Sequence, residues 1–374
     1  GVVKIVTCFD VPDITFPTAG HPFSLDPSHM DIADRKLLNQ RVRYYGDDIA
    51  AVVAKDTLTA SKAIKLIKVQ YEEYEPTLSI QDALREGSKP IHENYPDNIL
   101  AHSSYELGDY DNAIKEEGLI SFEGEYETPM VKHCYIESAI SYAYQEAGKI
   151  VVVSSTQIPH IMRRIVGQAI GINWGKVRII KPYIGGGFGG KQDILFEPLN
   201  AYLSLLVGGR CVKFDIPREE NFVSTRVRTA MKVKIKSYVR SNGKFVARKI
   251  EVYGNKGAYA SHGHSMVAKA CNAFKQIYQD EVATKGDAYT VFTNMPVSGA
   301  MRAYGIPQIT FAIESHVDEI ARALNLNPIE IRKLNMMKQG FVDNEIKSYS
   351  NGLVECIEKG KEYIDWDNKL EEYR

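Results

Sequence analysis

The order of hydrophobic and polar positions predicts short strands and helices in the first fifth of the chain. Residues 1–8 and 49–54 are apolar runs typical of strands. Residues 57–67 place Ala60, Ala63, Ile64 and Ile67 on one face of a helix, with Thr57 or Thr59 as its cap. Residues 41–46 and 68–74 also have a strand-like pattern, which predicts a small mixed α/β unit.

The remaining residues predict longer strands interspersed with helices. A hairpin turns at Ser241, Asn242 and Gly243, because Asn-Gly favours the tight turns that join antiparallel strands. The other predicted strands are 121–128, 139–145, 149–156 and 176–184, and the predicted helices are 158–171, 193–208, 311–325 and 328–339. Hairpins mixed with helices favour an α+β fold over a doubly wound parallel sheet.

Composition and net charge argue against several classes of protein. The 374 residues contain 46 Lys and Arg against 47 Asp and Glu, so the net charge of -1 gives no electrostatic reason to expect a nucleic acid or an anionic membrane as partner. No apolar run approaches the roughly 20 residues of a membrane helix. The five cysteines form no C-x-x-C pair that would hold zinc or an iron–sulfur cluster, and they favour a cytoplasmic location.

The stretch "IIKPYIGGGFGGKQDI" (179–194) places five glycines around Phe188. It matches G-x-x-x-x-G-K, the phosphate-binding P-loop, and G-x-G-x-x-G, the dinucleotide fingerprint. Gln192 stands where a P-loop needs a hydroxyl for Mg²⁺. The dinucleotide interpretation gains from Asp215 downstream, but Pro182 interrupts the preceding strand.

A third interpretation treats the glycines as bare backbone. A tight connection that serves only packing remains possible, yet each glycine costs backbone entropy. A loop this rich in glycine makes sense where a bulky ligand must contact backbone N–H groups beside a helix N-terminus. The loop therefore points to a large, polar, phosphate-bearing cofactor.

Two further motifs give the glycine loop a context. "VVVSSTQIPH" (151–160) precedes it and "SGAMRAYGIPQ" (298–308) follows it. These three segments, in this order, resemble the molybdenum hydroxylases, which include the xanthine dehydrogenases and aldehyde oxidases. Within them the chain looks closest to the molybdenum-binding subunit of the bacterial xanthine dehydrogenases. "RVRYYGDDIAAVVA" (41–54) and "NPIEIRKLNMM" (327–337) extend the resemblance along the chain.

The resemblance implies an architecture. Residues 1–84 are expected to form an α/β hammerhead domain and residues 85–98 a linker. Residues 99–374 are expected to form the first molybdopterin-binding domain. The chain is expected to be a truncated subunit, with the second cofactor domain and the family's base glutamate lying beyond Arg374, so no catalytic residue is assigned within it.

The same resemblance implies a molybdenum–molybdopterin cofactor, expected in a dinucleotide form, held by backbone and neutral side chains. The implied contacts to the molybdenum centre and pterin are Gln157, Gly187, Phe188, Gly189 and Arg302. The amide of Gln157 would reach an oxygen on molybdenum, since an amide donates without adding charge. Phe188 would lie against the metal and the pterin, and Arg302 would supply positive charge.

Implied substrate residues depart from the family pattern. Tyr304 takes the place of a phenylalanine that stacks on the substrate ring, and a tyrosine can still stack. Gln192 stands where xanthine oxidoreductases carry a purine-contacting glutamate. Residues 265–278 lack the second substrate-orienting arginine, with Lys269 nearby. Another purine or N-heterocycle is therefore as plausible as xanthine.

The expected whole enzyme hydroxylates an sp² carbon of such a heterocycle with oxygen from water. Electrons would pass to iron–sulfur and FAD subunits, in a homodimer of heterotrimers, and the fragment alone is expected to be inactive. The alternatives are a non-catalytic assembly subunit with the same fold and, third, a dinucleotide-binding oxidoreductase.

Four further polar residues and a tail are candidates for structural roles. His262 and His264 in "SHGHS" are expected to be a hydrogen-bonded pair more than a metal site, for which no third ligand is visible. His133 and Glu137 could form an acid–base pair, although buried structural roles are favoured. The tail 358–374 is expected to be a solvated helix.

Overall fold

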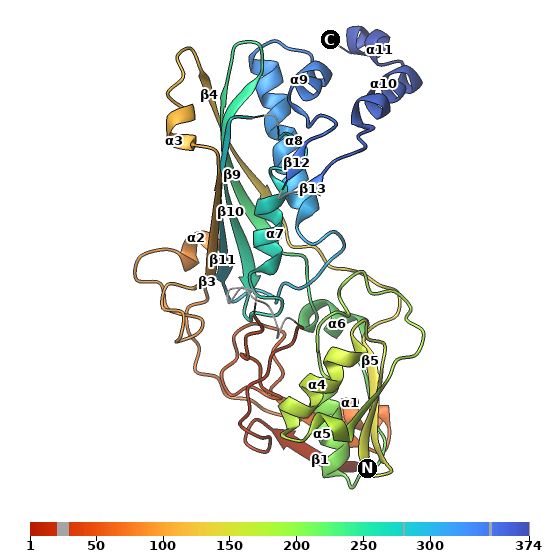
Figure 1. The fold of residues 1–374 in the computed structure, drawn as a ribbon. Coiled ribbons are helices and arrows are strands. Elements are labelled where there is room, and N and C mark those ends of the chain that lie inside the picture. The colour runs from red at the N-terminus through yellow and green to blue at the C-terminus, as the bar shows by residue number, and fades with distance from the viewer. Residues whose placement is uncertain (21–29, 280, 344–345, 374) are drawn as a thin grey trace.

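The computed structural model describes residues 1–20, 30–279, 281–343 and 346–373. Two sheets dominate these residues, and they occupy opposite ends of an elongated molecule with the N-terminus near one end and the C-terminus near the other (Figure 1). None of the helices in the described ranges is both long and apolar enough to cross a bilayer. The α+β class predicted from the sequence is confirmed, because antiparallel and parallel pairs occur together in each large sheet.

The larger sheet has five strands in the order β3-β11-β10-β9-β4. Its strands are β3 (Ile99–Leu107), β4 (Ile120–Thr128), β9 (Ala230–Val239), β10 (Phe245–Gly257) and β11 (Ala283–Phe292). β9 and β10 form the predicted hairpin, and Gly243 at its turn has φ +87°. A Cβ there would also meet Leu326 at 2.6 Å, so both the backbone conformation and the packing require glycine.

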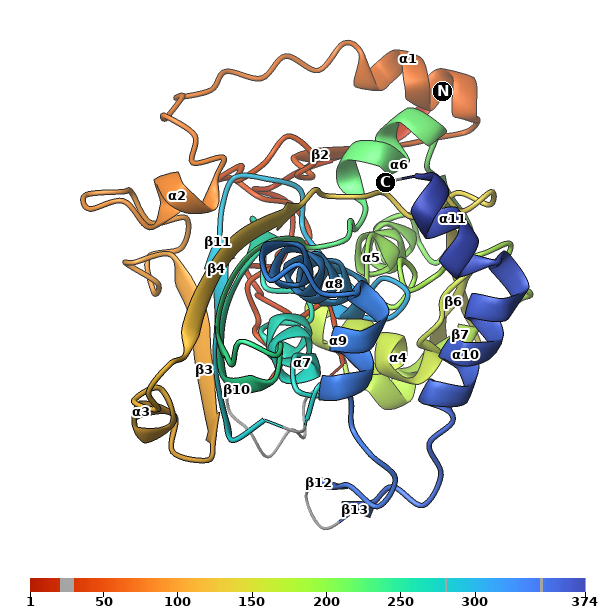
Figure 2. The same ribbon diagram turned by 90° about the horizontal axis from the view of Figure 1, so that it is seen from above.

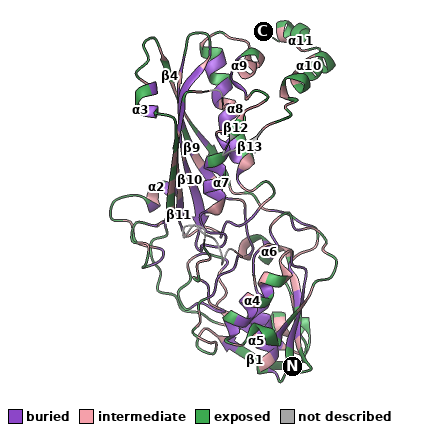
Figure 3. Ribbon diagram, viewed as in Figure 1, coloured by how far each residue is buried: buried purple, intermediate pink, exposed green. Residues whose placement is uncertain are grey.

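Helices cover one face of this sheet. α7 (Ser265–Ala273) packs on β10 and β11, and α8 (Ile306–Ala323) packs on β4 and β9 (Figure 2). Val252, Val267 and Ile309 belong to the resulting core. Buried segments recur along β9, β10 and the two helices, between half-buried and exposed ones (Figure 3). α9 (Pro328–Asn335) starts at the predicted Asn327-Pro328 signal, where the Asn327 side chain accepts from the Ile329 N–H.

The smaller sheet has four strands in the order β7-β6-β5-β8. Its strands and helices are β5 (Ile140–Glu146), β6 (Lys149–Ser154), α4 (Pro159–Ile170), β7 (Val177–Ile180), α5 (Glu197–Leu206) and β8 (Val212–Asp215). β6, α4 and β7 form a parallel β-α-β unit, and the apolar face of α4 packs on the sheet with Met162 and Ile165 fully buried. The ends of β6 and β7 lead into two of the motifs found in the sequence.

The N-terminal elements share this second core. β1 (Val2–Thr7) pairs antiparallel with β2 (Ala50–Ala54), and Val6 and Val53 pack with residues of α4 and α5. The predicted helix at 57–67 is shorter, α1 (Thr57–Ile64), and Asp56 caps it instead of Thr57 or Thr59. None of the residues of α1 is buried, so its apolar stripe covers no core within the described residues.

Two predicted strands near the N-terminus are wrong. Residues 41–46 turn instead of extending, because Asp47 accepts a hydrogen bond from the Arg43 N–H and Tyr44 is drawn inward to Ser224. Residues 68–74 pair with no strand among the described residues, and Val69, Tyr71 and Tyr74 are exposed. A strand pattern without a neighbouring strand leaves the backbone to water.

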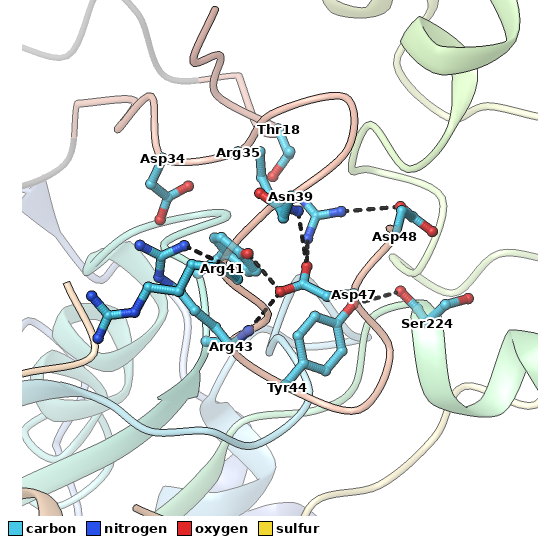
Figure 4. A network of polar contacts seen from close by, with 12 residues as sticks. Thr18, Asp34, Arg35, Asn39, Arg41, Arg43, Tyr44, Asp47, Asp48 and Ser224 are labelled. Carbon is cyan, nitrogen blue, oxygen red and sulfur yellow. Dashed lines mark hydrogen bonds and ion pairs between the residues drawn. The ribbon is translucent and has the colours of Figure 1, made fainter. Parts of the chain in front are cut away.

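Polar contacts fix residues 34–48 against the rest of the molecule (Figure 4). Arg35 donates to Asp47 at 2.7 Å and to Asp48 at 3.3 Å, and the Tyr259 hydroxyl donates to Asp47 at 2.7 Å. Asp34 accepts from the backbone N–H of Ala260 at 2.6 Å. These contacts position the segment that follows β10, which leads directly to His262.

The predicted linker at 85–98 lies between α2 (Ile80–Ala83) and β3 and contains neither helix nor strand. Ile80 and Ala83 pack against Val291 of the larger sheet. Asn98 is fully buried, and its side chain accepts from the Ile91 N–H and donates to the backbone carbonyls of Ala83 and Lys89. The segment is therefore held in place by its own polar contacts.

Candidate cofactor site

The glycine loop, residues 185–190, lies where three distant segments meet. It follows β7, contacts Gln157 after β6, and contacts Ala300 ahead of α8. α5 begins only at Glu197, so the glycines do not open that helix. Both the P-loop and the dinucleotide pattern need glycines at a helix N-terminus, and the structure therefore favours neither.

Gln157 is tied to the loop through its amide oxygen. Oε1 accepts from the backbone N–H of Gly189 at 3.1 Å and of Lys191 at 3.3 Å. The Gln157 N–H in turn donates to the Lys191 carbonyl at 2.9 Å. Because the oxygen is used in this way, the amide nitrogen Nε2 is left pointing elsewhere, with no hydrogen-bond partner among the described residues.

Close approach explains why residues 187 and 189 are glycines. A Cβ on Gly187 would lie 2.5 Å from Oε1 of Gln157. A Cβ on Gly189 would lie 2.6 Å from the Ala300 carbonyl, and Gly189 has φ +101°. Side chains at these two positions would push apart the segments that the loop joins.

Phe188 and Arg302 are joined through backbone. Phe188 has φ +51°, a conformation that side-chain-bearing residues rarely adopt, and its carbonyl accepts from the Arg302 N–H at 2.9 Å. The ring of Phe188 is 51% exposed, and Arg302 is exposed. No carboxylate of the described residues pairs with the Arg302 guanidinium. An aromatic face and an uncompensated positive charge thus stand beside the loop.

Glu137 and His133 each make polar contacts around the glycine loop. Among the described residues, no hydrogen bond joins the two as an acid–base pair. Glu137 accepts from the Gly185 N–H at 2.9 Å and from the Lys191 ammonium at 2.5 Å. Burial raises and the Lys191 contact lowers the pKa of Glu137, with a net lowering, while burial lowers the pKa of Lys191. The ring nitrogens of His133 lie 3.2 Å and 2.7 Å from the carbonyls of Arg226 and Ala300.

Gln192 is held between two anchored neighbours. Its N–H donates to the Gly189 carbonyl at 2.9 Å, and its side chain is half-buried. Asp193 is fully enclosed and pairs with Arg226 at 3.1 Å. Burial alone would raise the pKa of Asp193, but Arg226 and His262 lower it to about 2, so the group is ionised.

Tyr304 lies at the entrance to α8, in a run of three left-handed residues. Ala303, Tyr304 and Gly305 have φ of +71°, +49° and +97°. The Tyr304 hydroxyl lies 2.9 Å from Nδ1 of His262 and 2.7 Å from Oγ of Ser265. The ammonium of Lys269 lies 5.7 Å from the centre of the Tyr304 ring. Burial raises the pKa of Tyr304 to about 12, so the hydroxyl is protonated.

The structure thus brings the residues expected from the sequence close together. The structure joins Gln157, Gly187, Phe188, Gly189 and Arg302 by direct contacts, and it places Gln192 and Tyr304 on segments next to them. Asp193 and Ser265 were missed by the sequence interpretation, and His262 was regarded as structural. His264 bonds to the hydroxyls of Ser103 and Thr290. The only sequence signal for the missed residues was their closeness to Gln192 and to "SHGHS".

Known proteins share this sequence pattern and fold. The family profile described as molybdopterin cofactor-binding domain matches residues 91–336, and the profile described as aldehyde oxidase and xanthine dehydrogenase, a/b hammerhead domain, matches residues 1–75. The xanthine dehydrogenase molybdenum-binding subunit of Escherichia coli O157:H7 is 43% identical over the whole chain. The chain spans 49% of that relative's length.

Two more known proteins are similar to this chain, one in sequence and one in fold. The nicotinate dehydrogenase large molybdopterin subunit of Eubacterium barkeri is 34% identical over 87% of this chain and 76% of its own. The crystal structure of the aldehyde oxidoreductase from Desulfovibrio desulfuricans superposes with a TM-score of 0.91, at 24% identity, over 100% of this chain and 41% of that one. With a profile match over most of its length and a relative at this identity, the chain belongs to the molybdopterin cofactor-binding family of the aldehyde oxidases and xanthine dehydrogenases.

Proposed function

We propose that the chain is part of the molybdenum-binding subunit of a molybdenum hydroxylase that oxidises a purine-like or related N-heterocycle. The proposal divides it into a hammerhead domain at 1–84, a linker at 85–98 and the first cofactor domain from 99 onward. The relatives named for xanthine and for nicotinate support a nitrogen heterocycle as the substrate class. The observation that carries the proposal is the hydrogen bonding of Gln157 to the glycine loop.

The residues of the loop fit an anionic molybdopterin. Bare backbone at Gly187 and Gly189 allows a large group to approach, and the Arg302 guanidinium supplies positive charge. Nε2 of Gln157 can donate to an oxygen on the metal, because its oxygen is already held by Gly189 and Lys191. When bound, the cofactor supplies two-electron oxidation chemistry. A dinucleotide form of the pterin belongs to the proposal.

The chain's own residues would bind and orient the heterocycle. Tyr304 offers an aromatic ring and Gln192 an amide that can donate and accept. The Lys269 ammonium lies near the Tyr304 ring and offers a positive charge beside it. Because Gln192 is neutral, its preference for purine N–H groups is weaker than that of a glutamate. We therefore expect a broader substrate range than xanthine alone.

The proposed whole enzyme includes a second molybdopterin domain, an iron–sulfur subunit and an FAD subunit, in a cytoplasmic homodimer of heterotrimers. All five cysteines are unpaired, which fits a reducing compartment. The base that activates water would come from the second cofactor domain. A non-catalytic assembly subunit would not require the contacts that hold Gln157 and Arg302 in place, so it is less well supported.

The test is to purify the full-length subunit with its partner subunits and measure molybdenum, pterin and turnover. Xanthine, hypoxanthine, nicotinate and an aromatic aldehyde form the substrate panel, with a dye as electron acceptor. We expect one molybdenum per subunit and the highest kcat/KM with one of the heterocycles. A complex that holds molybdenum and oxidises only the aldehyde, or that holds none, would overturn the proposal.

A further inference from the structure

A chain of contacts runs from the buried Asp193 to the half-buried ring of Tyr304. Oδ2 of Asp193 lies 3.6 Å from Nε2 of His262, and Nδ1 of His262 lies 2.9 Å from the Tyr304 hydroxyl. The side chains of Asp193 and His262 are 0% and 7% exposed. Three segments that are far apart in the sequence therefore meet in a carboxylate–imidazole–hydroxyl arrangement.

One set of donors and acceptors satisfies the contacts of this arrangement. Asp193 is ionised beside Arg226 and accepts from the Ser261 hydroxyl at 2.6 Å. The Ser265 hydroxyl donates to the His262 carbonyl, so its Oγ accepts from the Tyr304 O–H. The Tyr304 oxygen in turn accepts from Nδ1–H of His262. The phenol proton consequently points into the protein.

Ser265 closes the arrangement around the same hydroxyl. Its Oγ lies 2.7 Å from the Tyr304 hydroxyl and 2.8 Å from the His262 carbonyl, to which it donates. The rings of His262 and Tyr304 meet edge to face, with centres 5.6 Å apart. The hydroxyl therefore has two protein partners, and little of its hydrogen-bonding capacity is left for another group.

The backbone of Tyr304 needs such a tether. Ala303 and Tyr304 are side-chain-bearing residues with left-handed φ, and such conformations persist where the surroundings over-determine them. The Tyr304 N–H is held at 2.8 Å by the Met301 carbonyl, and the ring is held at its far end by His262. Fixing both ends leaves the ring a single orientation.

We propose that His262 is a positioning residue for the substrate ring: with Ser265 it holds the hydroxyl of Tyr304, so that the Tyr304 ring, and not its hydroxyl, faces the bound heterocycle. This inference rests on the proposed function, because it takes Tyr304 to be the stacking residue. Asp193 lies 3.6 Å from Nε2 of His262 and adjoins Gln192, the second expected substrate contact. The same buried carboxylate therefore lies beside Gln192 and beside the residue that holds Tyr304.

The experiment compares single and double variants in the full-length enzyme complex. Tyr304→Phe keeps the ring and removes the hydroxyl, and His262→Gln removes the imidazole. Each is expected to raise KM about fivefold, the size of one neutral hydrogen bond, with kcat almost unchanged and molybdenum content unchanged. Xanthine, hypoxanthine and nicotinate are assayed in parallel. The double variant is expected to behave like either single variant, because His262 acts only through the hydroxyl.

A matched control lies in the larger sheet. Nδ1 of the buried His316 lies 3.0 Å from the Tyr126 hydroxyl, the same kind of pair far from the loop. His316→Gln is expected to lower stability and leave KM as it is. If His262→Gln fails to fold, Ser265→Ala carries the same test, with an increase in KM that disappears in the Tyr304→Phe background.

Two outcomes overturn the inference, and a further variant distinguishes its failure from a failure of the proposed function. Multiplying effects of His262→Gln and Tyr304→Phe would show that His262 does not act through the hydroxyl. An unchanged KM in a folded, molybdenum-loaded His262→Gln enzyme would remove the positioning role. Tyr304→Ala distinguishes the two failures. If it leaves kcat/KM unchanged for every heterocycle, the stacking role in the proposed function fails, and the inference fails with it. If Tyr304→Ala lowers kcat/KM and His262→Gln does not, only the inference about His262 fails.

Discussion

The amide oxygen of Gln157 lies 3.1 Å from the backbone nitrogen of Gly189, across 32 positions of sequence. This hydrogen bond joins the end of β6 to the glycine loop and sets the direction in which the other half of the amide points. Backbone donors thereby hold the oxygen of this neutral side chain, and its nitrogen keeps its N–H groups for another acceptor.

Gly187→Ala should disrupt the site while leaving the fold intact. The added Cβ would lie 2.5 Å from Oε1 of Gln157, so the amide must move away from the loop. Because changes to residues that orient a metal centre commonly cost 10–100-fold in metal affinity, we expect at least ~10-fold less molybdenum per protein. Metal analysis of the full-length complex measures this.

The matched control is Gly360→Ala in α10 (Leu353–Ile364). A Cβ at Gly360 meets nothing within 4 Å, so alanine there should retain molybdenum and stabilise the helix slightly. Equal molybdenum content in the two variants would contradict the role given to Gly187.

Gln157→Glu separates the two functions of the amide. A carboxylate still accepts from Gly189 and Lys191, so the loop should keep its conformation, but it has no N–H to donate. We expect kcat to fall by about 100-fold, comparable to the loss of one preorganised donor at a reacting centre. The thermal midpoint should move little. Full activity in this variant would mean that the donor is not used.

The Lys191–Glu137 pair predicts an asymmetry between two substitutions. The Lys191 side chain is 3% exposed and that of Glu137 is 31% exposed. Glu137→Gln leaves a buried ammonium without its carboxylate and should cost about 3 kcal/mol. Lys191→Met leaves a carboxylate that water can reach, so its cost should be smaller. Denaturant unfolding of the single and double variants measures both, and equal costs would contradict the difference in burial.

His316 predicts a pH dependence of stability. Burial, and secondarily Arg248, lower the pKa of His316 from its ordinary 6.5 to about 4. Between these values the unfolded chain binds a proton that the folded chain refuses, so the contribution of His316 to stability is complete above pH 6.5 and decreases as the pH falls toward 4. The difference in unfolding free energy between the wild type and His316→Gln should shrink by up to about 1.4 kcal/mol per pH unit. Denaturant unfolding at pH 7, 6, 5 and 4 measures it, and a constant difference would contradict the prediction.

Gln192→Glu should narrow the substrate range. A carboxylate accepts more strongly from purine N–H groups than an amide does, so kcat/KM for xanthine should rise relative to nicotinate by about 10-fold. Molybdenum content should not change, because the Gln192 backbone is held by the Gly189 carbonyl. A ratio that stays constant would remove Gln192 from the substrate contacts.

Local patterns predicted most of the regular elements. The β9–β10 hairpin, α4, α9 and the position of the glycine loop follow from turn residues, periodicity and caps, which act within a few residues of each other. Residues 68–74 show the limit of this reasoning. Their alternation is that of a strand, but pairing depends on a neighbouring strand that a local pattern cannot reveal.

The site was predicted unevenly for the same reason. Gln157, Phe188 and Arg302 lie in motifs with a recognisable order, so a family resemblance identified them. The contact of Asp193 with His262 joins residues 69 positions apart that share no periodicity, and only the fold brings them within 3.6 Å. Whether the expected residues bind cofactor and substrate stays a prediction until the variants are measured.

The anchoring on both sides of Gln192 has a consequence for how such a protein can diversify. Lys191 pairs with Glu137, and Asp193 pairs with Arg226. The backbone of Gln192 is therefore held on both sides, while the Gln192 side chain is half-buried. Under the proposed function, a new residue at 192 would change which heterocycle the site recognises while the backbone on both sides stays held. Selection could then reach new substrates by single substitutions at this position, at little cost to folding.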